Sequence, residues 1–223
     1  MLNKFNRLED FLRYTRSKGV YSFTLDNLKK TFPTTSYKTL KQSLYRLKLK
    51  NEISLIRHGF YVIIPPEYSK VRTLPPYLFI DDLMKSLHKN YYVGLFSAAA
   101  LHGSAHQQPM EFSVITNKPA PRNISKLKIR FLAKNLIPTC GIVKKSTPAG
   151  YINVSSPELT VLDLLQNAGK LGLNHVLTVI YELLPEIKVK NLKNSLDNYD
   201  NSTTIQRLGF VLEEVFWEKN YLW

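Results

Sequence analysis

The first third of the chain repeats its apolar residues with the spacing of three short helices. The first helical pattern stops before Gly19, and the second begins after Thr24, a residue that can cap a helix, and ends at Pro33. The third covers residues 36–50, and its apolar positions fall on one side: Leu40, Leu44 and Leu47. The pattern predicts three amphipathic helices, with a short turn between the second and the third.

Period-two alternation follows the third helix. Residues 53–55 alternate apolar and polar side chains, His58-Gly59 supplies a tight turn, and residues 60–64 return as a β-branched and aromatic strand. Helices followed by such a β-ribbon have the layout of a winged helix-turn-helix. We therefore expect a winged helix-turn-helix domain over residues 1–72.

The remainder of the chain mixes helical and strand patterns without an internal repeat. A domain boundary is expected between the proline pairs Pro65-Pro66 and Pro75-Pro76, with a second domain over residues 77–223. Helical patterns cover residues 80–87, 97–102 and most of the chain after 155, and strand patterns cover residues 91–93, 111–116, 127–133, 141–145 and 150–154. This order predicts an α+β fold, in which a mixed sheet is flanked by helices.

Two capping arrangements are possible where the helix after residue 154 begins. Ser155 and Glu158 have the spacing of a capping box, in which each side chain bonds to the backbone of the other residue. Ser156 can instead cap the helix with Pro157 at its first position. The residue pattern allows either arrangement.

The charge of the chain is strongly positive and unevenly distributed. The 223 residues include 31 Lys and Arg against 17 Asp and Glu, a net charge of +14. Residues 1–72 hold 15 basic and 5 acidic residues, whereas residues 73–223 hold 16 and 12. The first third therefore carries most of the excess, as expected when one module does most of the phosphate binding.

The polar side of the third predicted helix carries groups that suit DNA contact. Gln42 suits adenine and Arg46 suits guanine, so these two are the candidate base readers, whereas the basic residues around them are expected to contact phosphates. A solvated helix surface is the competing interpretation, as is a winged helix that binds protein. The candidate DNA-binding set, with the last two at the ribbon tip, is Lys38, Thr39, Lys41, Gln42, Tyr45, Arg46, Lys48, Arg57 and His58.

A second basic stretch lies in the middle of the chain. Residues 122–145 hold seven basic residues and no acidic one: Arg122, Lys126, Lys128, Arg130, Lys134, Lys144 and Lys145. Lys128 and Arg130 are expected to share one face of the strand at residues 127–133, because they are two residues apart. This secondary basic surface could contact nucleic acid or an acidic partner, or could be a solvated sheet face.

Residue patterns of catalysis and metal binding are weak. The chain has no phosphate loop, GxGxxG, HExxH or nucleophile elbow. His102 and His106 have the spacing of a metal pair on a helix, but Gly103 interrupts that helix. Gly103-Ser104 followed by Glu111 resembles the pattern of nucleotidyltransferases without a second acid for a metal pair. We therefore expect no catalytic residue, no metal and no cofactor.

Cysteine usage and hydropathy indicate a cytoplasmic setting. Cys140 is the single cysteine, so an intrachain disulfide is impossible. The longest apolar run, around residues 91–101, is shorter than the roughly 18 residues that a membrane span requires. We expect no membrane partner.

Four segments carry a resemblance to a known family. HGFYVIIPPEY, YYVGLFSAAALHG, INVSSPELTVLDLL and IQRLGFVLEE follow one another in the order typical of that family. The chain resembles the AbiEi-type antitoxins of bacterial type IV toxin–antitoxin (abortive infection) systems. Their order and spacing carry the resemblance, since each segment consists mostly of packing residues.

The resemblance implies a transcriptional repressor without enzymatic activity. Its winged helix would bind inverted repeats in the double-stranded promoter DNA of its own operon. Its larger mixed α/β antitoxin-type domain would assist that binding and counteract a cognate nucleotidyltransferase-like toxin. Two other functions remain open from the residues: an enzyme that acts on nucleic acid, and an RNA- or protein-binding adaptor, each delivered by the winged helix.

Overall fold

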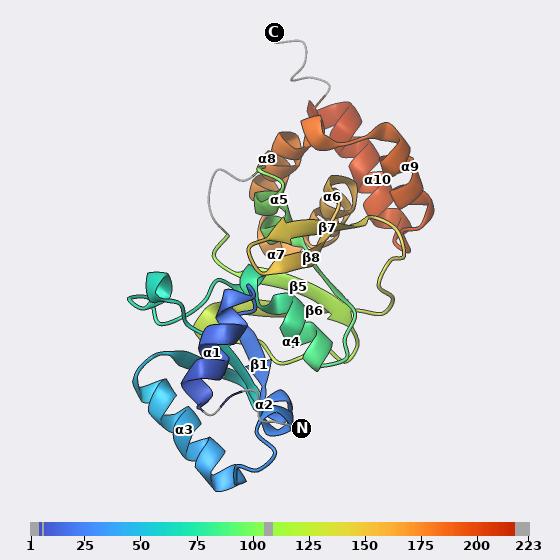
Figure 1. Ribbon diagram of the computed structural model, residues 1–223. Helices are drawn as coiled ribbons and strands as arrows, with labels where there is room; N and C mark the ends of the chain where they lie inside the picture. Colours follow the sequence, from blue (N-terminus) through green and yellow to red (C-terminus); the bar gives the residue numbers. More distant parts are fainter. Residues whose placement is uncertain (1–4, 6, 105–108, 217–223) are drawn as a thin grey trace. The chain divides into compact units, whose positions relative to one another are not determined.

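The computed structural model describes residue 5 and residues 7–104 and 109–216 (Figure 1). The chain forms two compact units: residues 1–89 with 146–152, and residues 90–145 with 153–223. Helices and two sheets make up a mixed α/β structure. The first unit includes the helix α4 (Ile80–Ser86). The domain boundary that the sequence places between residues 72 and 77 stays a prediction.

Three helices of the first unit occupy the segments with helical spacing: α1 (Leu8–Ser17), α2 (Leu25–Thr31) and α3 (Tyr37–Leu49). The Thr24 side chain accepts a hydrogen bond from the Asn27 N–H at 3.1 Å, which confirms its role as the cap of α2. Ser36 caps α3 in the same way, with 3.1 Å between its hydroxyl and the Thr39 nitrogen. These side chains satisfy amide groups that the first turn leaves unpaired.

A three-stranded antiparallel sheet completes these helices. Its order is β1 (Ser22–Thr24), β3 (Phe60–Ile63), β2 (Ile53–Arg57). Gly59 has φ +76°, so the turn between β2 and β3 uses the left-handed conformation expected of a glycine there. The sequence prediction included the ribbon of β2 and β3 and missed the short strand β1.

The core of the first unit lies between α1, α2, α3 and the sheet. Leu28, Leu47 and Val62 are at most 1% exposed, and the Phe23 and Tyr61 rings stack with centroids 5.4 Å apart. Each apolar residue at the predicted inner positions of α3 is buried: Leu40, Leu44 and Leu47. The amphipathic pattern of α3 therefore has the orientation that the sequence predicts.

The second sheet has five strands in the order β6 (Ile129–Lys134), β5 (Phe112–Asn117), β4 (Tyr91–Val93), β8 (Gly150–Ser155), β7 (Ile142–Thr147). β4 pairs antiparallel with β5 and parallel with β8, and β5 pairs parallel with β6. The sheet is therefore mixed, as expected, and each predicted strand is present within two residues of its predicted bounds.

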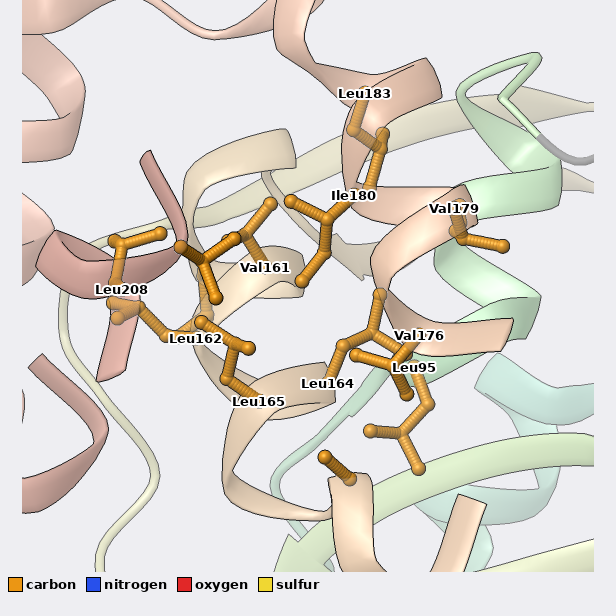
Figure 2. Packing of buried hydrophobic residues seen from close by; sticks show 14 of the residues in the cluster. Leu95, Val161, Leu162, Leu164, Leu165, Val176, Val179, Ile180, Leu183 and Leu208 are labelled. Atoms are coloured by element: carbon orange, nitrogen blue, oxygen red, sulfur yellow. The ribbon is translucent and has the colours of Figure 1, made fainter. Parts of the chain in front are cut away.

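Helices gather on one side of this sheet: α5 (Leu95–Leu101), α6 (Pro157–Gln166), α7 (Ala168–Leu171), α8 (Leu173–Leu183), α9 (Val189–Asp197) and α10 (Ser202–Phe210) (Figure 1). α6 is buried on nearly every side, since its residues 158–165 are all inaccessible to solvent. Figure 2 shows Leu162 and Leu165 of α6 near Leu208, and Leu164 near Val176. α6 therefore forms the centre of this core.

The beginning of α6 uses the second of the two capping arrangements. The Ser156 side chain accepts a hydrogen bond from the Leu159 N–H at 3.3 Å, and Pro157 is the first helical residue. Glu158 does not reach back to the cap, because its Oε1 accepts the Lys188 N–H at 2.9 Å. The capping box of Ser155 and Glu158 is therefore absent, and Glu158 instead holds the segment before α9.

Candidate functional site

The outer side of α3 presents every predicted contact residue of that helix to solvent. Lys38, Thr39, Lys41, Gln42, Tyr45, Arg46 and Lys48 are all exposed, and the Tyr45 side chain is 63% exposed. Because the leucines of the opposite side fill the core, this orientation is fixed by packing. The two candidate base readers, Gln42 and Arg46, are four residues apart and therefore lie on the same side of the helix.

The first turn of α3 also carries a compact cationic arrangement. The Lys41 ammonium lies 4.5 Å from the centroid of the Tyr37 ring, and the Lys29 ammonium lies 5.1 Å from it. The Thr39 hydroxyl is 2.9 Å from the Ser36 hydroxyl, so it takes part in the helix cap. Two lysines from α2 and α3 thus share one aromatic ring at the start of α3, which concentrates positive charge there.

The turn between β2 and β3 lies beside the same region. Arg57 and His58 line a pocket of about 550 Å³ together with Lys29 and Tyr37. The His58 side chain is exposed, and Arg57 is half-buried. Tyr37 and Arg57 are twenty residues apart in sequence. The fold therefore brings the predicted ribbon-tip residues and the start of α3 together around one pocket of the first unit.

The seven basic residues of 122–145 do not form one surface of a single strand. β6 and β7 occupy opposite edges of the five-stranded sheet, and four strand spacings of about 4.8 Å separate them. Lys144 and Lys145 lie on β7, whereas Arg130 and Lys134 lie on β6. Arg122, Lys126 and Lys128 precede β6 and are exposed. This strand order separates Lys144 and Lys145 from Arg130 and Lys134, and the binding role of the seven residues stays a prediction.

The predicted pairing of Lys128 with Arg130 on one strand face is wrong. Lys128 ends a short 3-10 helix in the left-handed conformation, at φ +52°, and β6 begins only at Ile129. Arg130 forms an ion pair with Glu111 at 3.5 Å. The alternation of a strand therefore does not apply to this pair, because one member lies before the strand.

Lys134 belongs to a buried charged cluster rather than to an open basic surface. Its ammonium lies 3.0 Å from Asp163 Oδ1 and 4.6 Å from the centroid of the Tyr199 ring. Tyr92 donates its hydroxyl proton to Asp163 Oδ2 at 2.8 Å, and the Tyr199 hydroxyl lies 3.0 Å from Asp163 Oδ1. The Asp163 side chain is 2% exposed, so these groups take the place of water around its charge.

Burial also fixes the protonation of the two phenols. Burial raises the pKa of Tyr92 and of Tyr199 well above the ordinary value, and the charge of Asp163 raises each further. Both phenols therefore stay protonated and act as donors to the carboxylate. The Tyr199 hydroxyl also lies 2.6 Å from the Gln166 amide oxygen, and its single proton serves one of these two acceptors at a time.

The Asp163 cluster was missed by the residue patterns, although one signal was present. Asp163 is the single charged residue in the apolar run of residues 159–165. A lone acid on a helix that is otherwise apolar must be paired if the helix is buried. Tyr92 and Lys134 lie far from it in sequence, so the identity of its partners required the fold.

The residues considered for metal binding or catalysis do not assemble into a site within the described part of the chain. His102 Nε2 lies 2.7 Å from the Ser155 carbonyl oxygen, and burial lowers the pKa of His102. His106 lies outside the described residues. Glu111 forms an ion pair with Arg130. Across residues 7–104 and 109–216, no three His, Cys, Asp or Glu side chains cluster as metal ligands.

The helices were also compared with what a membrane span requires. Among the residues that the structure describes, no helix has both the length and the apolar character to cross a membrane.

Comparison with known families identifies the class of the second unit. The model of the AbiEi antitoxin C-terminal domain matches residues 92–214, which is more than half of the chain. The protein therefore belongs to the AbiEi antitoxin family, as the four sequence segments predicted. This matched stretch includes α5 and α6 and the buried Asp163 cluster.

Comparison with solved structures extends the similarity of fold over most of the chain. The crystal structure of the RV2827C protein from Mycobacterium tuberculosis has a TM-score of 0.65 and 14% sequence identity, and the match covers 92% of this chain and 75% of that one. The solution structure of the antibiotic-resistance factor ANT(2'')-Ia has a TM-score of 0.39 and 8% identity, and covers 64% of this chain and 92% of that one. No curated protein matched the sequence.

Proposed function

We propose that this AbiEi-family antitoxin binds the double-stranded promoter DNA of its own operon and represses its transcription. The single observation that carries the proposal is the exposed side of α3. The buried leucines of α3 face the core, so this side faces solvent. Beside Tyr45, it carries five cationic or amide side chains: Lys38, Lys41, Gln42, Arg46 and Lys48.

The arrangement of the first unit supports a winged helix-turn-helix. α2 and α3 are joined by a short turn, and the β2–β3 hairpin follows α3 directly. In a winged helix-turn-helix the last helix enters the major groove, and the ribbon reaches the neighbouring backbone. α3 would then contact base edges through Gln42 and Arg46, and Arg57 and His58 at the ribbon tip would contact the backbone.

The lysines of α3 are assigned to phosphates. Lys38, Lys41 and Lys48 are point charges on flexible stems, which suits contacts that position the protein without reading sequence. Inverted repeats in the promoter would match two copies of the protein related by two-fold symmetry. Family membership favours a non-enzymatic regulator and supports an antitoxin role, which we extend to counteracting a nucleotidyltransferase-like toxin encoded beside it.

Promoter binding is tested by fluorescence anisotropy with labelled duplex DNA from upstream of the operon. The Lys41→Ala, Arg46→Ala double variant should bind at least tenfold more weakly than the wild-type protein, since each contact is worth about 1–3 kcal/mol. The matched control is Lys190→Ala with Lys193→Ala, which removes the same charge from the exposed side of α9 in the second unit. Equal affinity of the α3 variant and the control would overturn the assignment of α3.

The antitoxin role requires a separate experiment. Co-expression of the neighbouring toxin gene with the wild-type protein should restore growth, and the α3 double variant should restore it as well. This outcome would show that neutralisation does not require the DNA contacts proposed for α3. If cells that express the toxin stop growing with the wild-type protein and also with the α3 double variant, this protein does not counteract that toxin.

A further inference from the structure

A cavity of about 430 Å³ lies within the second unit beside the Asp163 cluster. Strands β5 and β6 supply one wall, with the apolar residues Ile115 and Leu132. α6, α7 and α10 supply polar groups to the same space. Its volume falls within the range of about 300–1,000 Å³ that is typical of small-molecule sites.

The charges of this cavity are unbalanced toward positive. Among the described residues, three cations line it, Lys134, Lys170 and Arg207, against the one carboxylate of Asp163. The carboxylate is already paired with Lys134 at 3.0 Å. Lys170 on α7 and Arg207 on α10 are exposed, and neither has a salt bridge within the described residues. Two cations from different helices therefore face one space, and within the described residues neither forms an ion pair with a carboxylate.

The other lining residues suit an organic group that carries both an apolar face and polar edges. Ile115 and Leu132 offer an aliphatic surface. The Gln166 amide oxygen already accepts from Tyr199 and the Asn167 amide nitrogen already donates to the Asp163 carbonyl, so the Gln166 amide nitrogen is the donor for a ligand and the Asn167 amide oxygen is the acceptor. Inorganic phosphate alone would leave most of this volume to water. A planar base beside the aliphatic wall, with its edge toward the amides, would use the remaining space.

We propose that this cavity binds a nucleoside monophosphate. Lys170 and Arg207 contact the phosphate, whose charge of nearly −2 at neutral pH they balance. Ile115 and Leu132 pack against the base, and Lys134 stays paired with Asp163. The proposal does not depend on DNA binding by α3, because every residue of the cavity belongs to the second unit.

Isothermal titration of the full chain with AMP, GMP, CMP and UMP tests the proposal. At least one of the four should bind saturably, whereas its nucleoside and inorganic phosphate should each bind at least tenfold more weakly. The Lys170→Ala, Arg207→Ala double variant should lose at least tenfold in affinity. The Lys190→Ala, Lys193→Ala control removes the same charge from α9 and should bind as the wild-type protein does.

A second variant tests the location without removing charge. Gly169 lines the cavity, and a Cβ atom added there would meet no atom within 4 Å beyond its chain neighbours and the backbone of its own helix. Gly169→Phe should therefore fold and should block the nucleotide sterically. In amide NMR spectra of the wild-type protein, the nucleotide should shift the signals of Asn167 and Gly169.

Several results would overturn the proposal. Absence of binding by all four nucleotides would do so, as would equal binding by inorganic phosphate or by the nucleoside. Full affinity in the Gly169→Phe variant would show that the nucleotide binds elsewhere. If the Lys170→Ala, Arg207→Ala variant instead lost affinity for duplex DNA while no nucleotide bound, the two cations would be nucleic-acid contacts and the cavity would not be a nucleotide site.

Discussion

The Lys134 ammonium lies 3.0 Å from the Asp163 carboxylate, and this ion pair joins the edge strand β6 to the buried helix α6. The Asp163 side chain is 2% exposed, while 21% of the Lys134 side chain still reaches solvent. Two phenol hydroxyls complete the surroundings of the carboxylate. The pair therefore links the sheet to the helical core and holds a charge in a place where an unpaired charge would be costly.

Asp163→Asn should lower the free energy of unfolding by about 2–4 kcal/mol, because it leaves Lys134 without its counter-charge in a mostly buried position. The loss should be measured by urea denaturation at neutral pH. Asp197→Asn at the exposed end of α9 is the control and should change the free energy by less than about 0.5 kcal/mol. Equal changes in the free energy of unfolding for the two substitutions would show that the ion pair of Lys134 with Asp163 does not stabilise the fold.

Leu44 and Tyr45 are neighbours in sequence on opposite sides of α3, and their alanine variants should differ in kind. Leu44 is 4% exposed, so Leu44→Ala should cost about 2–5 kcal/mol of stability through lost packing. Tyr45 is 63% exposed, so Tyr45→Ala should leave the melting temperature nearly unchanged and should weaken promoter binding. Thermal denaturation and anisotropy on both variants check this. Loss of stability in Tyr45→Ala would mean that its ring packs against the protein.

Salt dependence should separate phosphate contacts from base readers. Lys38→Ala should reduce the slope of log affinity against log salt concentration by about 0.9, the value expected for one lost phosphate contact. Gln42→Ala should leave the slope unchanged and should reduce the preference for promoter over unrelated duplex. Titrations at four salt concentrations with both duplexes provide the measurement. A slope that falls in Gln42→Ala but not in Lys38→Ala would reverse the two assignments.

His102 should make stability depend on pH. Burial lowers the pKa of His102 in the folded state, and its Nε2 lies 2.7 Å from the Ser155 carbonyl oxygen, which suits a neutral ring that donates a proton. Its contribution is therefore fully present above the unfolded-state pKa of about 6.5 and is lost as pH falls through that value toward the lower folded-state pKa.

The comparison with His102→Gln isolates this effect, because glutamine does not titrate and can donate to the same carbonyl. The difference in unfolding free energy between the two proteins should change between about pH 7 and about pH 5, with the wild-type protein losing more on acidification. Denaturation curves across that range are the measurement. A difference that stays constant with pH would show that His102 does not titrate between the two states.

Local patterns predicted elements well and long-range relationships poorly. The apolar spacing of Leu40, Leu44 and Leu47 determined which side of α3 is buried, because a helix places residues four apart on one side. The cap at Thr24 followed from residue type, whereas the cap at Ser156 was one of two arrangements that the residues allowed. The family resemblance of the second unit could also be predicted, and the comparisons confirm it.

Two relationships that the residue patterns did not predict share one physical cause. Arg130 and Lys144 are fourteen residues apart in sequence, yet the strand order places them at opposite edges of a sheet. Lys134 looked like any exposed lysine, because Asp163 lies almost thirty residues further along the chain. Which charges meet is decided by topology, and topology is not encoded in the spacing of neighbouring residues.

The place of β4 in the sheet has a consequence for the order of synthesis. Val93 of β4 pairs with Val154 of β8, which is made 61 residues later (154 minus 93). Until β8 has left the ribosome, one edge of the central strand lacks its native neighbour, and an open strand edge is where nascent chains pair wrongly. The second unit can therefore complete its sheet only after Ser155, the last residue of β8, has been translated.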